Sequence, residues 1–347
     1  MRGLAKTAGK AGCIDVINVD RPEIQSGEAL VEVAYAGLCG SDVGIYEFEN
    51  AYDFMDFPRI LGHEYAGTVV EVSDDVTRVS IGDRVVEAPN HGCGECFRCK
   101  SGTPNLCQDF TITGVHHDGA FTDYVAVPER FLFSIPDDLS LRAAAATEPT
   151  AVAARTVCRN SRTTAGDRVL VEGPGPIGLL TAMIARRQGG DVVVTGVDQD
   201  ERVRLPTARE LGFDTENVAE RDIETVRGEY TGGRGFDVVF DATGHESGLV
   251  GAADAVRKGG QVVVVGQSGH VSLDFTPFIR GEIDLQCSYA ATWPDFGRAT
   301  ELLRSGAVNV DPLLDDGFTL ADEEGLFKAA MHGETIKPLI EFAGENG

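Results

Sequence analysis

The chain has 347 residues, of which 42% are hydrophobic, and its 55 acidic and 30 basic side chains give a formal net charge of -25. This length predicts two domains, with enough apolar content for a core in each. The negative charge would repel nucleic-acid phosphates and anionic lipid, so it argues against both as partners. We see no apolar run of membrane-spanning length and no charged-then-apolar leader after Met1, and we therefore expect a cytoplasmic protein.

The acidic residues are distributed along the chain and do not gather in a tail. Pairs occur at Asp74-Asp75, Asp137-Asp138 and Asp315-Asp316, all in stretches typical of a surface. A distributed excess would strain the compact state by self-repulsion unless salt screened it. This pattern favours a halophilic source, although an ordinary acidic enzyme is the alternative.

Residues 30–127 predict a β-rich, barrel-like region. Short β-branched runs, such as residues 29–35, 67–72 and 82–86, are broken by Gly, Pro and Asp. Within this region, Cys39-Gly40-Ser41-Asp42 and Gly62-His63-Glu64 place a thiol, an imidazole and a carboxylate on what we expect to be separate β-rich segments. All three are zinc-ligand types. Taken singly, Cys39 could be a small buried hydrophobe and His63 a core histidine.

Four cysteines lie within fifteen residues. Cys93, Cys96, Cys99 and Cys107 have the x2, x2 and x7 spacing of a closed tetrahedral site, which indicates structural zinc. A disulfide knot or an iron–sulfur cluster is the alternative.

After Glu148-Pro149 the pattern changes to alternating helices and strands. An Ala-rich helical stretch leads to a strand at residues 169–171 and a helix at 179–187, and further buried strands are expected at 192–198, 238–241 and 262–266. This alternation predicts an α/β, doubly wound parallel sheet. After about residue 284 it fades into a mixed tail, which we expect to pack back onto the first domain.

Three glycines between the first strand and its helix form a dinucleotide-binding fingerprint. Gly173, Gly175 and Gly178 follow the G-x-G-x-x-G spacing, and the turn would present a pyrophosphate to the helix N-terminus. Asp198, twenty residues after Gly178, is expected to close the next strand and to bind the ribose diol, which favours NAD over NADP. Asp198 could instead cap the following helix, and Arg202 or Arg204 could pair with a 2′-phosphate.

The order of these motifs resembles the zinc-dependent medium-chain alcohol and polyol dehydrogenase family. The motifs are Cys39-Gly-Ser-Asp, Gly62-His-Glu-x-x-Gly-x-Val, Gly82-Asp-Arg-Val, the four-cysteine lobe and the glycine fingerprint. Within the family, the chain is most similar to the sorbitol (L-iditol 2-) dehydrogenase branch. Glu148-Pro149 matches the polyol and threonine dehydrogenases, and Tyr289-Ala-Ala-Thr-Trp-Pro294 followed by Ser305-Gly-Ala-Val-Asn-Val310 resembles the C-terminal segment of the sorbitol enzyme. The resemblance implies a GroES-like catalytic domain at residues 1–150, with its zinc lobe at about 90–108, a Rossmann domain at 151–285 and a return to the catalytic domain at 286–347.

The same resemblance implies site residues and cofactors. Cys39, His63 and Glu64 would ligate a catalytic zinc, and Glu148 would either ligate it or hold its water. Ser41 would pass the substrate proton outward, and the lobe would hold a second, structural zinc. The cofactor side would include Gly173, Gly175, Ile177, Gly178, Asp198 and Arg204. A homodimer or homotetramer is implied.

Two positions depart from the family pattern. Gly44 stands where the family often continues its proton relay with a histidine, and Ser288 stands where the sorbitol branch tends to carry an arginine.

From the motifs and the family resemblance, we expect NAD- and zinc-dependent oxidation of a secondary hydroxyl of a polyol or sugar to a ketone. An aldose 1-dehydrogenase and an L-threonine 3-dehydrogenase-like enzyme remain alternatives, as does a non-catalytic nucleotide-binding protein on the same fold.

Overall fold

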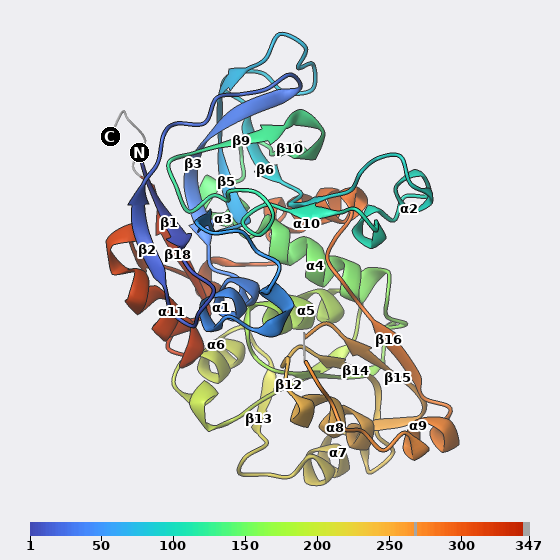
Figure 1. The fold of residues 1–347 in the computed structure, drawn as a ribbon. Helices are drawn as coiled ribbons and strands as arrows, with labels where there is room; N and C mark the ends of the chain where they lie inside the picture. Colours follow the sequence, from blue (N-terminus) through green and yellow to red (C-terminus); the bar gives the residue numbers. More distant parts are fainter. Residues whose placement is uncertain (267–268, 343–347) are drawn as a thin grey trace. The chain divides into compact units, whose positions relative to one another are not determined.

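The computed structural model describes residues 1–266 and 269–342 (Figure 1). The chain divides into two compact units. The first comprises Met1–Glu148 with Ala291–Gly347, and the second comprises Pro149–Ala290. Each unit is described by itself below. Among the described residues, none of the helices has the length and apolar character needed to span a bilayer.

The first unit is built on a seven-stranded sheet with the order β10-β6-β5-β3-β18-β17, in which β9 also pairs with β3. A three-stranded sheet, β2-β1-β4, and the pair β7-β8 complete it. The strands are β1 (Arg2–Lys6), β2 (Ile14–Asn18), β3 (Glu28–Gly37), β4 (Arg59–Ile60), β5 (Glu64–Val72), β6 (Arg84–Glu87), β7 (Asn90–His91), β8 (Thr111–Ile112), β9 (Tyr124–Pro128), β10 (Leu132–Ser134), β17 (Leu314–Phe318) and β18 (Lys337–Glu341).

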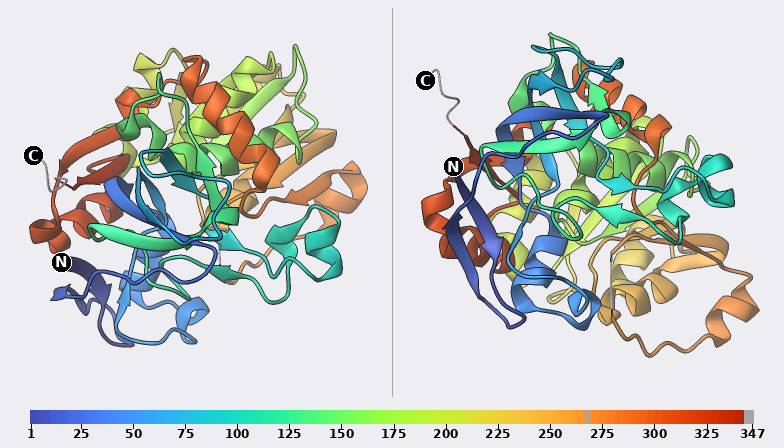
Figure 2. Two further views of the ribbon diagram at one scale, coloured as in Figure 1. Left: turned by 90° about the horizontal axis from the view of Figure 1, so that it is seen from above. Right: turned by 45° about the horizontal axis from the view of Figure 1, so that its top comes forward.

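The C-terminal strand of this sheet comes from the far end of the chain. Strand β18 pairs antiparallel with β3, with Leu339 opposite Gly37, and Figure 2 shows this red strand beside the blue one. The helices of the first unit are α1 (Gly40–Glu47), α2 (Phe97–Lys100), α3 (Leu141–Ala144), α10 (Trp293–Arg304) and α11 (Glu323–Met331). Helix α4 (Thr147–Cys158) contains the division between the units.

The second unit is a six-stranded sheet with the order β13-β12-β11-β14-β15-β16, and every neighbouring pair is parallel. This is the doubly wound Rossmann order, so the predicted fold class is confirmed. The strands are β11 (Arg168–Glu172), β12 (Asp191–Gly196), β13 (Asp214–Asn217), β14 (Phe236–Asp241), β15 (Val256–Val264) and β16 (Asp284–Cys287), and the helices after α4 are α5 (Pro176–Arg187), α6 (Arg204–Glu210), α7 (Ile223–Thr231), α8 (Glu246–Ala255) and α9 (Thr276–Gly281).

The central strands of the second unit consist largely of buried apolar residues. The side chains of Val169, Leu170 and Val171 in β11 are fully buried, as are Val262 and Val263 in β15. Strands covered on both faces are apolar at consecutive positions, which is why the sequence shows uninterrupted runs there.

The structure corrects several predicted element boundaries. Strand β15 covers Val256–Val264, so it begins six residues before the predicted start at 262 and ends two residues before the predicted end at 266. Helix α5 begins at Pro176, three residues before the predicted start, because proline fits the first turn of a helix and needs no N–H partner there. Strand β12 ends at Gly196, so Asp198 does not close it. Asp198 opens a short 3₁₀ helix, η4 (Asp198–Glu201), where the Val197 N–H donates to the Asp200 carboxylate.

Candidate functional site

Cys39 lies at the start of a helix, not on a β-rich segment as the sequence suggested. It is the N-cap residue of α1, directly after the end of β3. The Cys39 N–H donates to Asp42 Oδ2 at 2.9 Å, and the Gly62 N–H donates to Asp42 Oδ1 at 3.4 Å. The fully buried Asp42 carboxylate therefore joins the two segments that carry the candidate ligands.

His63 and Glu64 follow a turn that only glycine can make. Gly62 has a φ of +91°, and a Cβ there would come within 2.5 Å of the Phe121 ring. The turn sends the chain into β5 at Glu64. Both His63 and Glu64 are buried, with 7% and 1% of their surface exposed. The sulfur of Cys39, a ring nitrogen of His63 and a carboxylate oxygen of Glu64 lie within 4.8 Å of one another.

Glu148 belongs to the same electrostatic environment. It is in the first turn of α4 and is 8% exposed. Burial, followed by the charge of Glu64, raises the pKa of Glu148 to about 7, against the opposing effects of His63 and Lys337. A carboxyl group with this pKa can both hold and release a proton near neutral pH.

Lys337 is the site residue that sequence reasoning missed. It begins β18, and its Nζ donates to Glu64 Oε2 at 2.5 Å and to the Leu38 carbonyl at 2.9 Å. Burial opposes the charge of Lys337, but Glu64 and Cys39 outweigh burial and raise its pKa. The ammonium group therefore remains charged and fixes the Glu64 carboxylate in place. Its signal in the sequence was weak, because Lys337 is a single lysine before Pro338 in the tail.

Ser41 lies beside the imidazole. Its Oγ is 3.4 Å from His63 Nε2. Gly44 is one turn further along α1, where a Cβ would lie 3.0 Å from the Tyr52 ring and 3.3 Å from Glu49 Oε2. A side chain at position 44 would therefore require small shifts of Tyr52 and Glu49.

These residues fit a zinc ion. Thiolate, imidazole and carboxylate are its usual ligands; His63 and Glu64 are buried and Cys39 is half-buried. His63 Nδ1 is buried and has no hydrogen-bond partner within residues 1–266 and 269–342. Burial lowers the pKa of His63, but Asp42 and Cys39 outweigh burial and leave it well above its usual value, so the pocket favours positive charge at this point.

The second candidate metal centre is the cysteine lobe. The sulfurs of Cys93, Cys96, Cys99 and Cys107 also meet within 4.8 Å. Backbone N–H groups of Cys93, Cys96 and Cys99 donate to sulfur atoms of the lobe at 3.4–3.5 Å. Such bonds favour thiolates, the form that binds metal, and all four cysteines are free of disulfides. The lobe therefore fits a structural zinc.

The glycine fingerprint has the close contacts that its pattern requires. Gly173 has a φ of +93°, and a Cβ on Gly178 would come within 1.8 Å of the Gly173 carbonyl oxygen. Gly175 is the N-cap residue of α5, and no atom lies within 4 Å of the place where its Cβ would be. Ile177 is in the first turn of the same helix. The helix N-terminus is thus open to an anionic group.

The two residues predicted to select the cofactor have different surroundings. Asp198 is exposed, and its Oδ1 accepts a hydrogen bond from Asn217 Nδ2 at 2.9 Å, so Oδ2 remains for a ribose hydroxyl. Arg204 is in α6 and forms an ion pair with Asp200 at 3.3 Å. That pairing reduces the availability of Arg204 for a 2′-phosphate.

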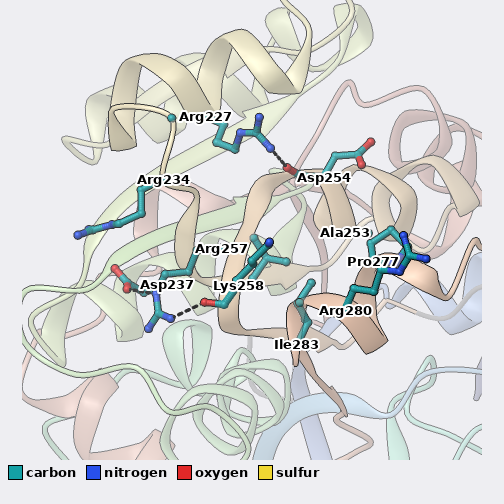
Figure 3. A pocket seen from close by; sticks show the side chains of 13 residues that line it. Arg227, Arg234, Asp237, Ala253, Asp254, Arg257, Lys258, Pro277, Arg280 and Ile283 are labelled. Carbon is teal, nitrogen blue, oxygen red and sulfur yellow. Dashed lines mark hydrogen bonds and ion pairs between the residues drawn. The ribbon is translucent and has the colours of Figure 1, made fainter.

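A hollow of about 950 Å³ in the second unit lies at the end of its sheet where the strands begin (Figure 3). It borders the starts of β14 and β15, whereas the fingerprint follows the end of β11. Helices α7, α8 and α9 end near it, and basic residues complement the negative ends of helices. Asp237 is held by Arg257 at 2.6 Å, and the Arg227 guanidinium donates to the Asp254 carbonyl. The helix ends and these contacts explain the basic lining without a ligand. The lining residues concerned are Arg227, Arg234, Arg257, Lys258 and Arg280.

Comparisons with known proteins agree with this geometry. Residues 25–137 match the alcohol dehydrogenase GroES-like domain, and residues 176–305 match the zinc-binding dehydrogenase domain. The chain is 35% identical to D-arabitol-phosphate dehydrogenase of Enterococcus avium, with 98% of this chain and 97% of the relative covered. It is also 35% identical to sorbitol dehydrogenase of Halalkalibacterium halodurans, with 98% and 99% covered.

A solved structure supports the same conclusion. The alcohol dehydrogenase rspB of Escherichia coli CFT073, solved with NADH, superposes with a TM-score of 0.89 at 27% identity, covering 99% of each chain. The fold and site thus define an oxidoreductase with a GroES-like domain and a Rossmann domain. The chain belongs to the zinc-binding medium-chain dehydrogenase family, which confirms the predicted enzyme class, a zinc-dependent NAD(P) dehydrogenase.

Proposed function

We propose that this enzyme oxidises a secondary hydroxyl group of a polyol or sugar to a ketone, with NAD as the hydride acceptor. The observation that carries the proposal is that ligand atoms of Cys39, His63 and Glu64 lie within 4.8 Å of one another, with Glu148 in the same electrostatic environment. The two relatives at 35% identity act on a polyol and a polyol phosphate by name, which supports this substrate class.

Cys39, His63 and Glu64 would hold the catalytic zinc, with Glu148 as a ligand or as the acceptor for its water. When bound, zinc supplies Lewis-acid polarisation that lowers the pKa of the substrate hydroxyl. Lys337 donates to Glu64 Oε2 and orients this carboxylate. We propose that Ser41 takes the hydroxyl proton and passes it on, which its Oγ position 3.4 Å from His63 Nε2 supports.

The proton cannot continue to a side chain at position 44. Gly44 carries none, and the nearby space holds Tyr52 and Glu49. We propose that the proton leaves Ser41 through water or another polar group. This affects the relay and leaves the zinc ligands unchanged.

We propose NAD as the preferred cofactor. The exposed Asp198 carboxylate can accept a hydrogen bond from a ribose diol and would repel a 2′-phosphate. The ion pair between Arg204 and Asp200 supports the same choice.

The exact substrate depends on loops around the site. Ser288 is 7% exposed and bonds to Thr156 Oγ1 and Asn160 Nδ2, both at 2.9 Å, so it lies within the second unit's own polar network. It supplies no guanidinium that could bind several hydroxyls. Threonine would need charged partners for its ammonium and carboxylate groups, and an aldose would react at its anomeric carbon.

The experiment is a turnover assay in high-salt buffer, with NAD and NADP each tested on sorbitol, xylitol, glucose, galactose, threonine and simple alcohols. Chelator-sensitive reduction of NAD confined to polyols is the expected result. Turnover on aldoses or threonine alone would move the assignment to those classes, and no turnover on any substrate would favour a non-catalytic nucleotide-binding protein.

We further propose a cytoplasmic homodimer or homotetramer adapted to concentrated salt. None of the eight cysteines forms a disulfide, which suits a reducing compartment. The net charge of -25 supports the adaptation to salt, and family membership supports the oligomer.

A further inference from the structure

Two buried carboxyl groups lie side by side in the second unit, outside the machinery described above. Glu172 is the last residue of β11 and Asp241 the last residue of β14, and the two are register partners on parallel strands. Partners in adjacent strands point to the same face of the sheet. Glu172 is 6% exposed and Asp241 is fully buried.

Within the described residues, no lysine or arginine forms an ion pair with Glu172 or Asp241. Asp241 Oδ1 accepts hydrogen bonds from the Thr243 N–H at 2.9 Å and from the Thr243 hydroxyl at 2.7 Å. Asp241 Oδ2 and Glu172 Oε2 are buried and have no partner in the part of the chain that the structure describes. Two adjacent carboxylates without a counter-charge cannot both stay ionised at low dielectric.

Two glycines of helix α8 lie close to the two carboxyl groups. A Cβ on Gly248 would come within 2.8 Å of Asp241 Oδ1, and a Cβ on Gly251 would come within 2.8 Å of Glu172 Oε1. Residues three apart share one helix face, so these two glycines leave room for both carboxyl groups beneath the helix.

The two carboxyl residues are adjacent in the chain to the backbone around the cofactor turn. Glu172 precedes the fingerprint residue Gly173, and Ala242 follows Asp241. The Ala242 N–H donates to the Glu172 carbonyl at 2.9 Å, and a Cβ on Gly173 would lie 3.1 Å from the Ala242 backbone. Any separation of the two strand ends would therefore move the turn that receives the pyrophosphate.

We propose that Glu172 and Asp241 share one proton, carried by Glu172 Oε2 and donated to Asp241 Oδ2, and that this proton holds the fingerprint turn in its dinucleotide-binding form. Asp241 is the ionised partner because it already accepts two hydrogen bonds and lies near the N-terminus of α8. Loss of the proton would set two carboxylates against each other and open the turn. Glu172 and Asp241 are thus positioning residues for the cofactor.

The surrounding charges agree with this assignment. Burial raises the pKa of Glu172 well above its usual value, and the charges of Asp241 and then Asp254 add to the effect. Burial also raises the pKa of Asp241, against the Thr243 hydrogen bonds and the nearby His245. The pKa of Glu172 is higher in the folded protein than in the unfolded protein. The contribution of Glu172 to the free energy of unfolding is therefore full below the unfolded pKa and is lost as the pH rises through the folded pKa.

The test is NADH affinity as a function of pH, measured by fluorescence titration in high salt for the wild type and for Glu172→Gln. The glutamine keeps an N–H donor toward Asp241 but cannot titrate. We expect wild-type affinity to fall at alkaline pH, by up to about tenfold per pH unit for one proton, and the variant to lack this component. The control is Glu216→Gln, a buried carboxyl paired with Arg221 at 2.7 Å, which should keep the wild-type pH profile.

Identical pH profiles for the wild type and Glu172→Gln would overturn the proposal. If Glu172→Gln did not fold, Asp241→Asn would decide the question, since only one carboxyl group would remain and the alkaline fall in affinity should disappear. Infrared spectroscopy of the wild type should show a protonated carboxyl band that Glu172→Gln lacks, and its absence would also refute the shared proton. The inference uses only the dinucleotide-binding part of the proposed function. Polyol oxidation with an unaltered pH profile would reject the inference alone.

Discussion

At the residue scale, the buried ion pair between Lys337 and Glu64 connects the end of the chain with the catalytic pocket. We predict that Lys337→Met lowers the free energy of unfolding by about 3–5 kcal/mol, because Glu64 would remain as a buried charge without its partner. Denaturant unfolding and zinc analysis measure the effect. The matched control is Lys328→Met, whose exposed pair with Glu324 contributes only about 0–1 kcal/mol. Equal losses for the two variants would contradict the assigned role of Lys337.

Glu148 gives a second prediction at this scale. We expect Glu148→Gln to fold normally, because a neutral amide replaces a group whose pKa is already raised to about 7. Turnover should fall by about 10²–10⁴-fold, the usual contribution of a general acid or base. Circular dichroism and steady-state kinetics measure the two effects. Normal turnover would show that Glu148 has no role in proton transfer or metal binding.

Sequence reasoning brought Cys39, His63 and Glu64 together because each lies in a short local motif. It could not find Lys337, which is separated from Glu64 by 273 positions and meets it only because β18 pairs with β3. It also gave no role to Asp42, although this residue fixes the Cys39 and His63 segments through two backbone N–H groups. Such contacts depend on tertiary pairing, which local patterns do not contain.

At the element scale, the cysteine lobe should fold separately from the catalytic pocket. Helix α2 has only four residues, which is too short to be stable without a covalent or metal crosslink. We predict that Cys96→Ser loses one zinc ion per chain and becomes protease-sensitive within residues 93–107. Atomic absorption and limited proteolysis test this prediction. A variant with unchanged zinc content would exclude a metal in the lobe.

Element types were easier to predict than element ends. The parallel strands were found because β11, β12, β14 and β15 each contain a continuous apolar run. The end of β12 was wrong because the run Val192 to Asp198 continues in sequence beyond Gly196, while the backbone turns to let Asp200 cap η4. A capping interaction of this kind offers the backbone N–H groups an alternative to the strand ladder.

At the scale of the whole molecule, the net charge of -25 determines how the protein responds to salt. Like charges repel over about 30 Å at 0.01 M salt and over about 3 Å at 1 M. We predict that the melting temperature rises steeply with KCl and that folded structure is lost at low salt. Differential scanning fluorimetry over a KCl series measures this, with uncharged sucrose as a control for general stabilisation. A melting curve insensitive to KCl would refute the adaptation.

The most direct test of the account is the zinc content of the purified chain, measured by mass spectrometry for the wild type and for His63→Ala. The account predicts two zinc ions per wild-type chain, one in each cysteine-containing site. His63→Ala should keep only the zinc of the lobe and should lose NAD-dependent turnover. One zinc ion per wild-type chain, or an active variant with only the lobe zinc, would contradict a catalytic metal at Cys39, His63 and Glu64.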